Sequence, residues 1–352
     1  MSFDPSTRLP VGKLPAGLLG PLLATFGPGD PDVIVGAGVG RDAAAIAVGD
    51  RILVVKTDPI TFASDNAAAY LVDVNANDLA CLGATPRWML VTALLPAGIT
   101  AGEVSAQFEA LRLASQARGI ALIGGHTEVT TGLDRTILVG CLLGETTPER
   151  LLRPGGARPG DRLLLTKSLA IEGTALLATE LGSLLEAGIG REMRDRARAL
   201  LDSPGISVLN DAQTLLATGG ITALHDVTEG GLAMAVREIA AAANAGARLD
   251  PRSIPILAET TAVAGYLELD PLGMLGSGSL LATAAPETVS KLIAAAEAAG
   301  FAVHDIGQIL PSAKGIHLHD NGTVGDLPTF DTDEVSRALN EFRYQVEGEG
   351  AP

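Results

Sequence analysis

The sequence predicts a mixed α+β protein made of two units. Its 352 residues are enough for about two domains, and 47% of them are hydrophobic, so large cores can form. Each half combines hairpin-like β-runs with helical segments, which favours α+β over a strict βαβ repeat. The predicted division is a flexible segment rich in glycine and proline (1–32), an N-terminal domain (33–153), a C-terminal α/β domain (154–335) and a tail (336–352).

The N-terminal half is predicted to open with a β-hairpin. Two β-like runs, Ala43–Val48 and Arg51–Thr57, flank the strong tight-turn signal Gly49-Asp50. Upstream lies only a short apolar run, Leu18–Phe26. The later elements are predicted to be a helix at Asp65–Gly83, a strand at Arg87–Pro96, a helix at Ala101–Arg118, and strands at Ile120–Gly124 and Thr136–Gly144.

The C-terminal half begins after the glycine- and proline-rich segment Arg153–Asp161, a predicted linker. Its predicted elements are a strand at Arg162–Thr166, helices at Glu172–Leu181, Arg191–Leu201 and Ile206–Thr218, a strand at Thr222–His225, a helix at Glu229–Ala243, a strand at Ser279–Ala284, a helix at Glu287–Ala299 and a strand at Ala302–Ile309. A short hairpin follows. The residues after Glu334 are predicted to be helical and then polar.

The charge and cysteine content exclude several classes of protein. A net charge of −16 argues against a nucleic-acid surface, which needs clustered Lys and Arg. A nucleotide is still possible, because Mg²⁺ bridges carboxylates to phosphates. Cys81 and Cys141 are too few for a disulfide framework and predict buried thiols in a reducing cytoplasm. The sequence shows no signal-type core and no apolar run of about 18 residues, so no membrane association is expected.

The stretch VIVGAGVGRDAA, residues 33–44, resembles a nucleotide loop. Asp58 lies about 20 residues beyond Gly38, where a dinucleotide-binding fold places its ribose acid. That fingerprint, however, requires a glycine at the position of Arg41, and its loop must open a helix. Here the loop leads into a hairpin strand, so an NAD-dependent dehydrogenase is not expected. Another kind of phosphate loop and a plain glycine-rich turn both remain open.

The predicted helix at Asp65–Gly83 carries polar residues where a core face is expected. An angular count at about 100° per residue places an amide and a carboxylate, Asn75 and Asp78, in the middle of its apolar face. The apolar members of that face are Ala67, Leu71, Val74 and Leu82. Buried carboxylates are costly without partners, which favours a metal or phosphate site. The alternatives are a ragged surface helix and an Asp78 that caps a neighbouring element.

Asp42, Asp58 and Asp78 share a setting that suits a magnesium ion. Each follows a glycine-rich loop, ends a strand or interrupts an apolar face. Mg²⁺ takes one or two carboxylates together with substrate phosphates. Lys56, in the sequence KTDP, is expected either to meet a phosphate or to be a snorkelling strand residue.

Two further glycine-containing motifs are candidate ligand sites. In IGGHTEVT, Gly124-Gly125 permit close backbone approach, and residues 126–128 are placed to face a ligand if acidic groups lie nearby. In HDVTEGGLAMAVREIA (225–240), Thr228 is the expected helix N-cap, and Gly230-Gly231 leave the first-turn N–H groups open to an anion. A simple capped junction between a strand and a helix is the alternative for this motif.

These motifs, in this order, resemble the AIR synthase (PurM-like) superfamily of ATP-binding proteins over about residues 10–330. The matching segments are GVGRDAA, KTDP, NANDLACLGATP, IGGHTE, PGDRLLLTK, HDVTEGGL and DPLGMLGSGSLL. The resemblance is greatest to the hydrogenase maturation factor HypE and to HypE-like AIR synthase-related proteins. It implies a homodimer whose N-terminal sheets form a barrel, with Mg-ATP bound between the domains.

The resemblance also implies roles for individual residues. Asp42, Asp58 and Asp78 match the acidic metal positions, and Asn75 is expected to orient Asp78. The other expected nucleotide contacts are Lys13, Gly38, Gly40, Thr57, Gly124, Gly125 and Thr127. The expected catalytic residues are Lys56, His126 and Glu128.

Two departures from the pattern shape the functional prediction. His126 stands where many relatives have an acid, and HypE ends in a cysteine, whereas this sequence has none after Cys141. We therefore expect an ATP-dependent phosphotransferase or dehydratase whose small-molecule or carrier-bound substrate arrives separately. The alternatives are a kinase of the thiamine-monophosphate type and a non-catalytic, nucleotide-sensing partner of a maturation protein.

Overall fold

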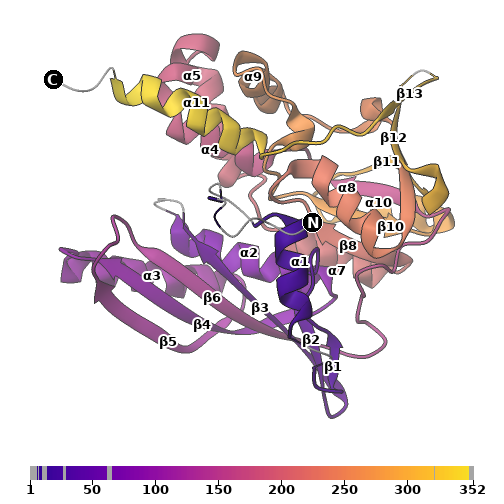
Figure 1. Cartoon of the computed structure of the whole chain (residues 1–352), viewed down its shortest axis with the longest axis horizontal. Helices are drawn as coiled ribbons and strands as arrows, with labels where there is room; N and C mark the ends of the chain where they lie inside the picture. Colours follow the sequence, from indigo (N-terminus) through magenta and orange to yellow (C-terminus); the bar gives the residue numbers. More distant parts are fainter. Residues whose placement is uncertain are drawn as a thin grey trace.

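The computed structural model describes residues 6, 8–9, 14–26, 29–61, 66–320 and 322–348. Two mixed β-sheets, each with its own helices, form the lower and upper right parts of the molecule in Figure 1. This arrangement confirms the predicted α+β class. Within the described residues, no helix is both long enough and apolar enough to cross a membrane.

The N-terminal sheet has six strands and is open. Their order is β1 (Val33–Val35), β2 (Ala44–Val48), β3 (Arg51–Ile60), β6 (Ile137–Thr146), β4 (Thr85–Pro96) and β5 (Ala121–Thr130). Only the β4–β5 pair is parallel. The predicted hairpin is confirmed, because Val48 pairs with Arg51 across Gly49-Asp50. A closed barrel is not formed within one chain, since β1 and β5 are the two edges of this sheet.

Three helices accompany this sheet: α1 (Ala16–Ala24), α2 (Ala67–Cys81) and α3 (Ala101–Ala117). Helix α1 lies in the segment 1–32, where the sequence predicts only an apolar run. Helix α3 begins with a capping box in which Thr100 and Glu103 satisfy each other's backbone N–H groups.

The C-terminal sheet has seven strands and is also mixed. Their order is β13 (Thr323–Asp326), β12 (Ile316–Asp320), β9 (Ala245–Leu249), β11 (Val303–Pro311), β7 (Arg162–Thr166), β10 (Leu280–Ala284) and β8 (Ile221–Asp226). The α-helices of this half are α4 (Ile171–Glu180), α5 (Gly182–Ile189), α6 (Arg191–Arg198), α7 (Leu209–Thr218), α8 (Gly231–Ala242), α9 (Ala258–Tyr266), α10 (Val289–Ala298) and α11 (Glu334–Gly348). Short 3₁₀ turns lie at Ala199–Leu201, Pro251–Ser253, Pro271–Gly273, Pro286–Thr288 and Ser312–Lys314.

Three elements of this half are absent from the sequence prediction: α5, β9 and α9. Their sequences are GSLLEAGI, AGARL and AETTAVAGY. They are short and rich in Ala, Gly and Thr, so they show no clear hydrophobic period. Packing against larger neighbours therefore decides their conformation.

Helix α2 is the element that joins the two halves. It packs against β3 and β6 of the N-terminal sheet and also against α7 and β8 of the C-terminal domain. One hydrophobic core accordingly continues from the first domain into the second. The buried amide of Asn77 strengthens this junction, because it donates to the Ile206 carbonyl at 2.9 Å and accepts from the Val208 N–H at 2.8 Å.

Strand β5 is longer than the sequence predicts, and it is exposed along nearly its whole length. The predicted strand ends at Gly124 and is followed by a ligand-binding loop, but Gly124 through Thr130 continue the strand. The φ angles of Gly124 and Gly125 are 150° and 148°, and a Cβ on Gly125 would lie 1.8 Å from the Val91 carbonyl oxygen. The two glycines thus permit β4 and β5 to pair closely.

Candidate functional site

A cleft of about 1050 Å³ lies at the junction of the two domains. Its N-terminal wall comes from β3, α2 and the glycine-rich loop before β2. Its C-terminal wall comes from α4, the end of β8 and the segment around residues 275–277. The acidic residues that line it are Asp42, Asp58, Asp78, Glu172, Glu180, Asp195, Asp202, Asp226 and Glu229. The cleft is therefore strongly acidic, which suits a cation or a cation-bound phosphate ligand.

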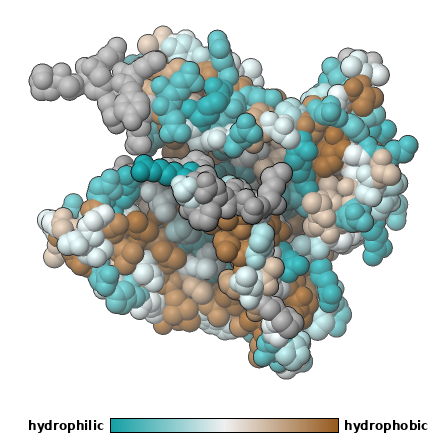
Figure 2. All heavy atoms as spheres, in the orientation of Figure 1, coloured by the Kyte–Doolittle hydropathy of each residue, from teal (hydrophilic) through white to brown (hydrophobic). Residues whose placement is uncertain are grey.

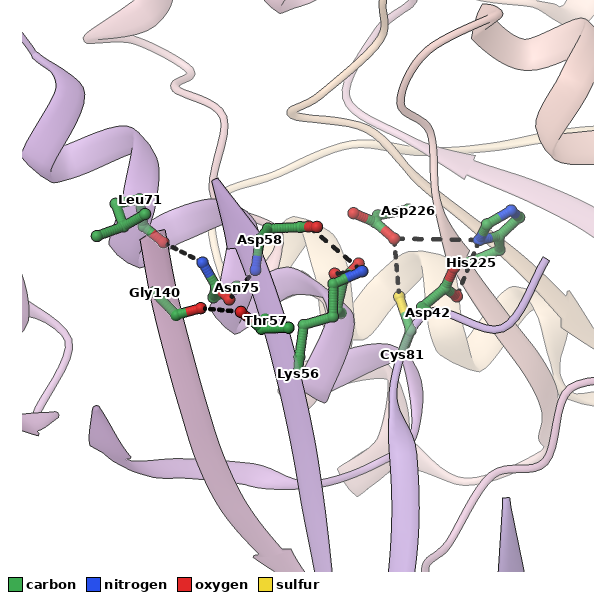
Figure 3. Close-up of polar contacts among 11 residues, drawn as sticks. Asp42, Lys56, Thr57, Asp58, Leu71, Asn75, Cys81, Gly140, His225 and Asp226 are labelled. Carbon is green, nitrogen blue, oxygen red and sulfur yellow. Dashed lines mark hydrogen bonds and ion pairs between the residues drawn. The ribbon is translucent and has the colours of Figure 1, made fainter. Parts of the chain in front are cut away.

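The three aspartates predicted to bind metal all line this cleft. Lys56 on β3 lies between two of them, with its Nζ atom 3.3 Å from Asp58 Oδ2 and 2.7 Å from Asp78 Oδ2 (Figure 3). The Asp78 side chain is only 7% exposed, so its carboxylate depends on Lys56 rather than on water for compensation. Burial of Asn75 and Asp78 on α2, predicted from the angular count, is confirmed.

The acids of the cleft perturb one another electrostatically. Burial raises the pKa of Asp78 well above its usual range, and the nearby Asp226 adds to this, while Lys56 opposes it. Burial lowers the pKa of Lys56, but the charges of Asp78 and Asp58 outweigh burial, so this pKa is raised above the ordinary value. The single positive charge of Lys56 thus offsets only part of the negative charge of the neighbouring carboxylates.

A second group of polar residues surrounds His225 at the end of β8. Its Nδ1 lies 3.1 Å from Asp42 Oδ2 and 4.0 Å from Asp226 Oδ1, and its Nε2 lies 2.7 Å from Glu238 Oε2. Asp226 Oδ1 also accepts the thiol hydrogen of Cys81 at 3.6 Å (Figure 3). Burial lowers the pKa of His225, but Asp42 and Glu238 outweigh burial and raise it well above its usual range. The sequence did not single out His225, Asp226 or Glu238 as ligands.

The structure gives Asn75 and Thr57 positioning roles. The Asn75 carbonyl accepts the Asp58 N–H at 3.1 Å, and its amide donates to the Leu71 carbonyl at 2.8 Å (Figure 3). Its hydrogen bonds therefore hold the backbone of Asp58, whereas the sequence analysis expected it to orient Asp78. Thr57 donates its hydroxyl to the Gly140 carbonyl at 2.7 Å, which ties β3 to β6.

The glycine-rich loop folds back on itself through Arg41. The Arg41 guanidinium donates to the Gly36 carbonyl at 3.0 Å, and a Cβ on Gly38 would lie 2.7 Å from Arg41 Nε. Gly40 has a φ of 70° and lies against Glu238, where a Cβ would be 3.8 Å from its Cγ. The glycines thus let the loop close and bring Asp42 to the C-terminal domain.

The structure does not bring the GGHTE residues to the aspartates of the same chain. Asp58, Gly140, Val91 and Gly125 pair in one row across β3, β6, β4 and β5. Three strand spacings separate Asp58 from Gly125, which is about 14 Å. His126 is one residue further along this exposed edge strand, and its Nε2 lies 3.1 Å from Glu128 Oε2. Thr127 is also exposed, and Lys13 lies outside the described residues.

A side chain of the protein itself, Asp333, lies beside the helix N-terminus in HDVTEGGL. The N-cap of α8 is Gly230, where the sequence predicts Thr228, and the Gly230 N–H donates to Asp333 Oδ2 at 2.8 Å. Asp333 also accepts from the Val335 N–H at 2.8 Å. The N-cap residue of α8 therefore provides no side-chain cap, and anion binding at the first-turn N–H groups stays a prediction.

Glu172 is a cleft residue that the sequence analysis missed. It lies in the first turn of α4 and is buried, and Tyr70 and Ser277 line the same cleft. Burial raises its pKa to about 7, although a hydrogen bond from Ser277 lowers it and the charge of Asp333 raises it further. The available signal was an acid inside the otherwise apolar segment AIEGTALLA. A carboxyl group with this pKa can accept or release a proton near neutral pH.

The donor set of the cleft fits a divalent cation. Asp42, Asp58 and Asp78 supply carboxylate oxygens, which hard cations such as Mg²⁺ prefer. Asp226 Oδ2 is buried and has no hydrogen-bond partner among the described residues. Buried acceptors without partners are rare in folded proteins, and a bound cation would satisfy this one.

Comparison with known proteins identifies related families and folds. The family "AIR synthase related protein, N-terminal domain" matches residues 40–146, and "AIR synthase related protein, C-terminal domain" matches residues 158–319. The chain is 31% identical to carbamoyl dehydratase HypE of Cupriavidus necator, over 73% of this chain and 72% of that protein. It is 29% identical to selenide, water dikinase of Geobacter metallireducens, over 84% and 92% of the two chains.

Solved structures share the fold. The hydrogenase maturation protein HypE in complex with ATP superposes with a TM-score of 0.69 at 20% identity, covering 90% of this chain and 92% of that one. Thiamine-monophosphate kinase from Stenotrophomonas maltophilia gives 0.65 at 24% identity, covering 84% and 93%. HypE in a HypE–HypF complex gives 0.68 at 18% identity, covering 81% and 93%.

Replacing Lys56 should show how much of the protein's stability depends on its ion pair with the buried Asp78. In metal-free buffer, Lys56→Met is expected to lower the free energy of unfolding by about 3 kcal/mol, because the buried Asp78 carboxyl group loses its charged partner. Adding Asp78→Asn should restore part of that loss. Urea unfolding of the two single variants and the double variant measures this coupling. Arg112→Met, which breaks the exposed Glu109 pair, is the control and should cost less than about 1 kcal/mol.

Strictly additive losses for Lys56→Met and Asp78→Asn would contradict this account of the pair.

Glu172 should make stability depend on pH around neutrality. Its folded pKa of about 7 exceeds the ordinary 4.5, so its protonated form stabilises the fold. This contribution is complete below about pH 4.5 and is lost as the pH rises through about 7. Glu172→Gln should therefore gain stability relative to wild type between pH 5 and pH 8, by about 3 kcal/mol at most.

Urea midpoints across that pH range measure the effect of Glu172→Gln, and Glu192→Gln on the exposed face of α6 serves as the control. A constant difference between Glu172→Gln and wild type over this range would exclude the shifted pKa.

Proposed function

This chain belongs to the AIR synthase related family, and on that premise we propose that it binds Mg-ATP in the cleft and uses it to activate a substrate by phosphorylation or dehydration. The observation that carries the proposal is that Asp42, Asp58 and Asp78 line one acidic cleft, in which Lys56 is ion-paired with Asp58 and Asp78. The ATP-bound HypE structure with the same fold and the relatives named carbamoyl dehydratase and selenide, water dikinase support it.

Asp42, Asp58 and Asp78 would hold Mg²⁺, which when bound neutralises phosphate charge. Asn75 fixes the backbone of Asp58, and Lys56 offers an ammonium group at the same wall. Glu172, across the cleft, can hold or release a proton at its carboxyl group near pH 7. Positioning and charge compensation are the main contributions that phosphoryl transfer needs from a protein.

We infer that the substrate reaches the cleft as a separate molecule or on a carrier. Cys81 is buried at the end of α2 with its thiol on Asp226, and Cys141 is fixed within β6. Neither thiol is placed to swing into the cleft as a carrier of the group to be activated.

We propose that β5 forms the interface of a homodimer, as the family resemblance implies. The strand is an exposed sheet edge that carries Ile123 and Val129, whose exposed fractions are 54% and 58%. Figure 2 shows hydrophobic side chains over the part of the molecule that holds the N-terminal sheet. Long exposed edges of this kind favour pairing with another strand. In such a dimer, His126 and Glu128 would act on the cleft of the partner.

The proposal of nucleotide binding is tested with Asp58→Asn. Wild type is expected to bind ATP only with Mg²⁺, and the variant should bind at least about tenfold more weakly, because a metal ligand is lost. Calorimetry and the nucleotide-dependent rise in Tm measure this. Asp50→Asn in the exposed hairpin turn is the matched control and should bind as wild type does.

Absence of Mg-dependent ATP binding by wild type would overturn the proposal. Two other outcomes would redirect it. Phosphorylation of thiamine monophosphate would favour the kinase alternative, for which the kinase structure of the same fold is the supporting observation. Binding without turnover, together with capture of a maturation protein, would favour the nucleotide-sensing alternative, for which the HypE–HypF complex is the support.

The dimer proposal is tested by charging the β5 edge. Ile123→Lys combined with Val129→Lys should convert a dimer into a monomer, because lysines on the edge strands of the two chains repel across the interface. Analytical ultracentrifugation measures the mass. Val324→Lys on β13, where the residue is similarly exposed at 56%, should leave the dimer intact. A monomeric wild type, or a doubly substituted variant that stays dimeric, would contradict the proposal.

A further inference from the structure

A second cavity, which shares no lining residue with the acidic cleft, lies between the end of α3 and the C-terminal domain. We propose that this cavity, the α3–α7 pocket, binds a small organic anion in which a carboxylate or phosphate monoester is attached to an apolar group. Its volume is about 930 Å³, within the range of roughly 300 to 1,000 Å³ that is common for small-molecule sites. The site goes beyond the proposed Mg-ATP function, because it uses neither the cleft nor a metal ion.

The charge balance of the α3–α7 pocket differs from that of the cleft. Nine acids and two cations line the cleft, whereas the charged residues that line the pocket, within the described part of the chain, are Arg118, Lys167, Asp211 and Glu259. Both of these acids are paired, Asp211 with Lys167 and Glu259 with Arg196. An anion in this pocket therefore avoids the excess of carboxylates that would repel it from the cleft.

Lys167 is held at the pocket wall at a conformational cost. It follows β7 and has a φ of 56°, in the left-handed region that non-glycine residues rarely adopt. A glycine would adopt this conformation without strain, and residues strained in this way cluster at functional sites. The Lys167 Nζ donates to the Ser207 carbonyl at 2.6 Å and lies 3.1 Å from Asp211 Oδ2. The third hydrogen of the ammonium group remains available to a ligand.

Arg118 adds a guanidinium group whose orientation is fixed. Its Nε donates to Asp73 Oδ1 at 2.6 Å, and its Nη2 donates to Asp73 Oδ2 at 3.0 Å. Its Nη1 makes no hydrogen bond to any residue that the structure describes. Since a guanidinium carries five N–H donors in one plane, the Asp73 fork leaves the Nη1 hydrogens for a carboxylate or phosphate oxygen. The two domains thus each contribute one cation to the pocket.

Apolar side chains decide the rest of the ligand. Leu200, Leu257 and Phe301 also line the pocket. An inorganic ion would fill little of the volume and would leave these side chains without a contact. Burial of an apolar group against them would add affinity in proportion to the buried area. The pocket therefore suits an anion that is joined to an aromatic or aliphatic group.

Helix α2 connects the α3–α7 pocket to the acidic cleft. Its Asp73 holds Arg118, and its Asn77 forms hydrogen bonds with the backbone on both sides of Ser207. The same helix carries Asp78, which lines the cleft. A ligand that shifts the pocket walls would therefore shift α2, so binding at the pocket is expected to change the affinity for Mg-ATP. This coupling, unlike the site itself, rests on the proposed function.

The test uses phenyl phosphate and benzoate as probes, without nucleotide and with a chelator that removes divalent metal. Wild type is expected to bind one probe molecule per chain, at least about tenfold more tightly than inorganic phosphate, which lacks the apolar group. Titration calorimetry gives the stoichiometry and the dissociation constants. Tighter binding of phenyl phosphate assigns the site to a phosphate monoester, and tighter binding of benzoate assigns it to a carboxylate.

Two variants with matched controls locate the site. Lys167→Gly removes both the ammonium group and the strain at its φ, and it should weaken binding of the tighter probe at least about tenfold. Its control is Glu268→Gly, which replaces an exposed residue at a φ of 51° and should bind as wild type does. Arg118→Lys keeps a positive charge beside Asp73 but loses the fork, and it should weaken binding about fivefold. Its control is Arg112→Lys on the exposed face of α3.

The proposal is overturned if wild type binds neither probe, or if both variants bind as tightly as wild type. If Lys167→Gly does not fold, Arg118→Lys carries the test.

The coupling is measured by adding Mg-ATP. A saturating probe should change the dissociation constant of ATP at least about fivefold, and Lys167→Gly should abolish this change. Equal ATP affinity with and without the probe would overturn the coupling through α2. Failure of the Mg-ATP proposal gives a different result, because probe binding that depends on Lys167 and Arg118 would persist in a protein that does not bind ATP.

Discussion

The structure depends on keeping several carboxylates out of water at the junction of two domains. Asp78 on α2 and Asp226 at the end of β8 are both buried, and Lys56 is the cation nearest to Asp78. Uncompensated buried charge destabilises a fold, so it persists only where a ligand or a partner offsets the desolvation free energy. The acidic cleft is therefore suited to the proposed binding of cations and of the phosphates that accompany them.

Helix α2 makes this arrangement possible because it belongs to both halves of the molecule. One side of α2 packs on the N-terminal sheet. Its Asn77 forms hydrogen bonds with the backbone of Ile206 and Val208 in the C-terminal half. The contact between Asp42 and His225 crosses the same junction over 183 residues of sequence. Any change in how the domains pack would thus alter the distances among the acids, which couples cation binding to domain arrangement.

The GGHTE motif of edge strand β5 affects both the pairing of β5 with β4 and the distance of its polar residues from Asp58. Its glycines permit close pairing with β4, and its exposed His126 and Glu128 lie about 14 Å or more from Asp58 across the sheet. In the proposed homodimer, a catalytic role for these two residues would lie at the interface between chains rather than in the chain's own cleft. Strand pairing, rather than sequence proximity, decides which cleft they can reach.

The sequence by itself determined what depends on local pattern. Alternation and turn residues located the β2–β3 hairpin and strand β7, and the helical period placed Asn75 and Asp78 on a buried face. Only the tertiary structure decided what depends on distant segments meeting. The grouping of His225 with Asp42 and the contact of Asp333 with the start of α8 have no local signature. Periodicity reports which face of an element is buried, but not which other element lies against it.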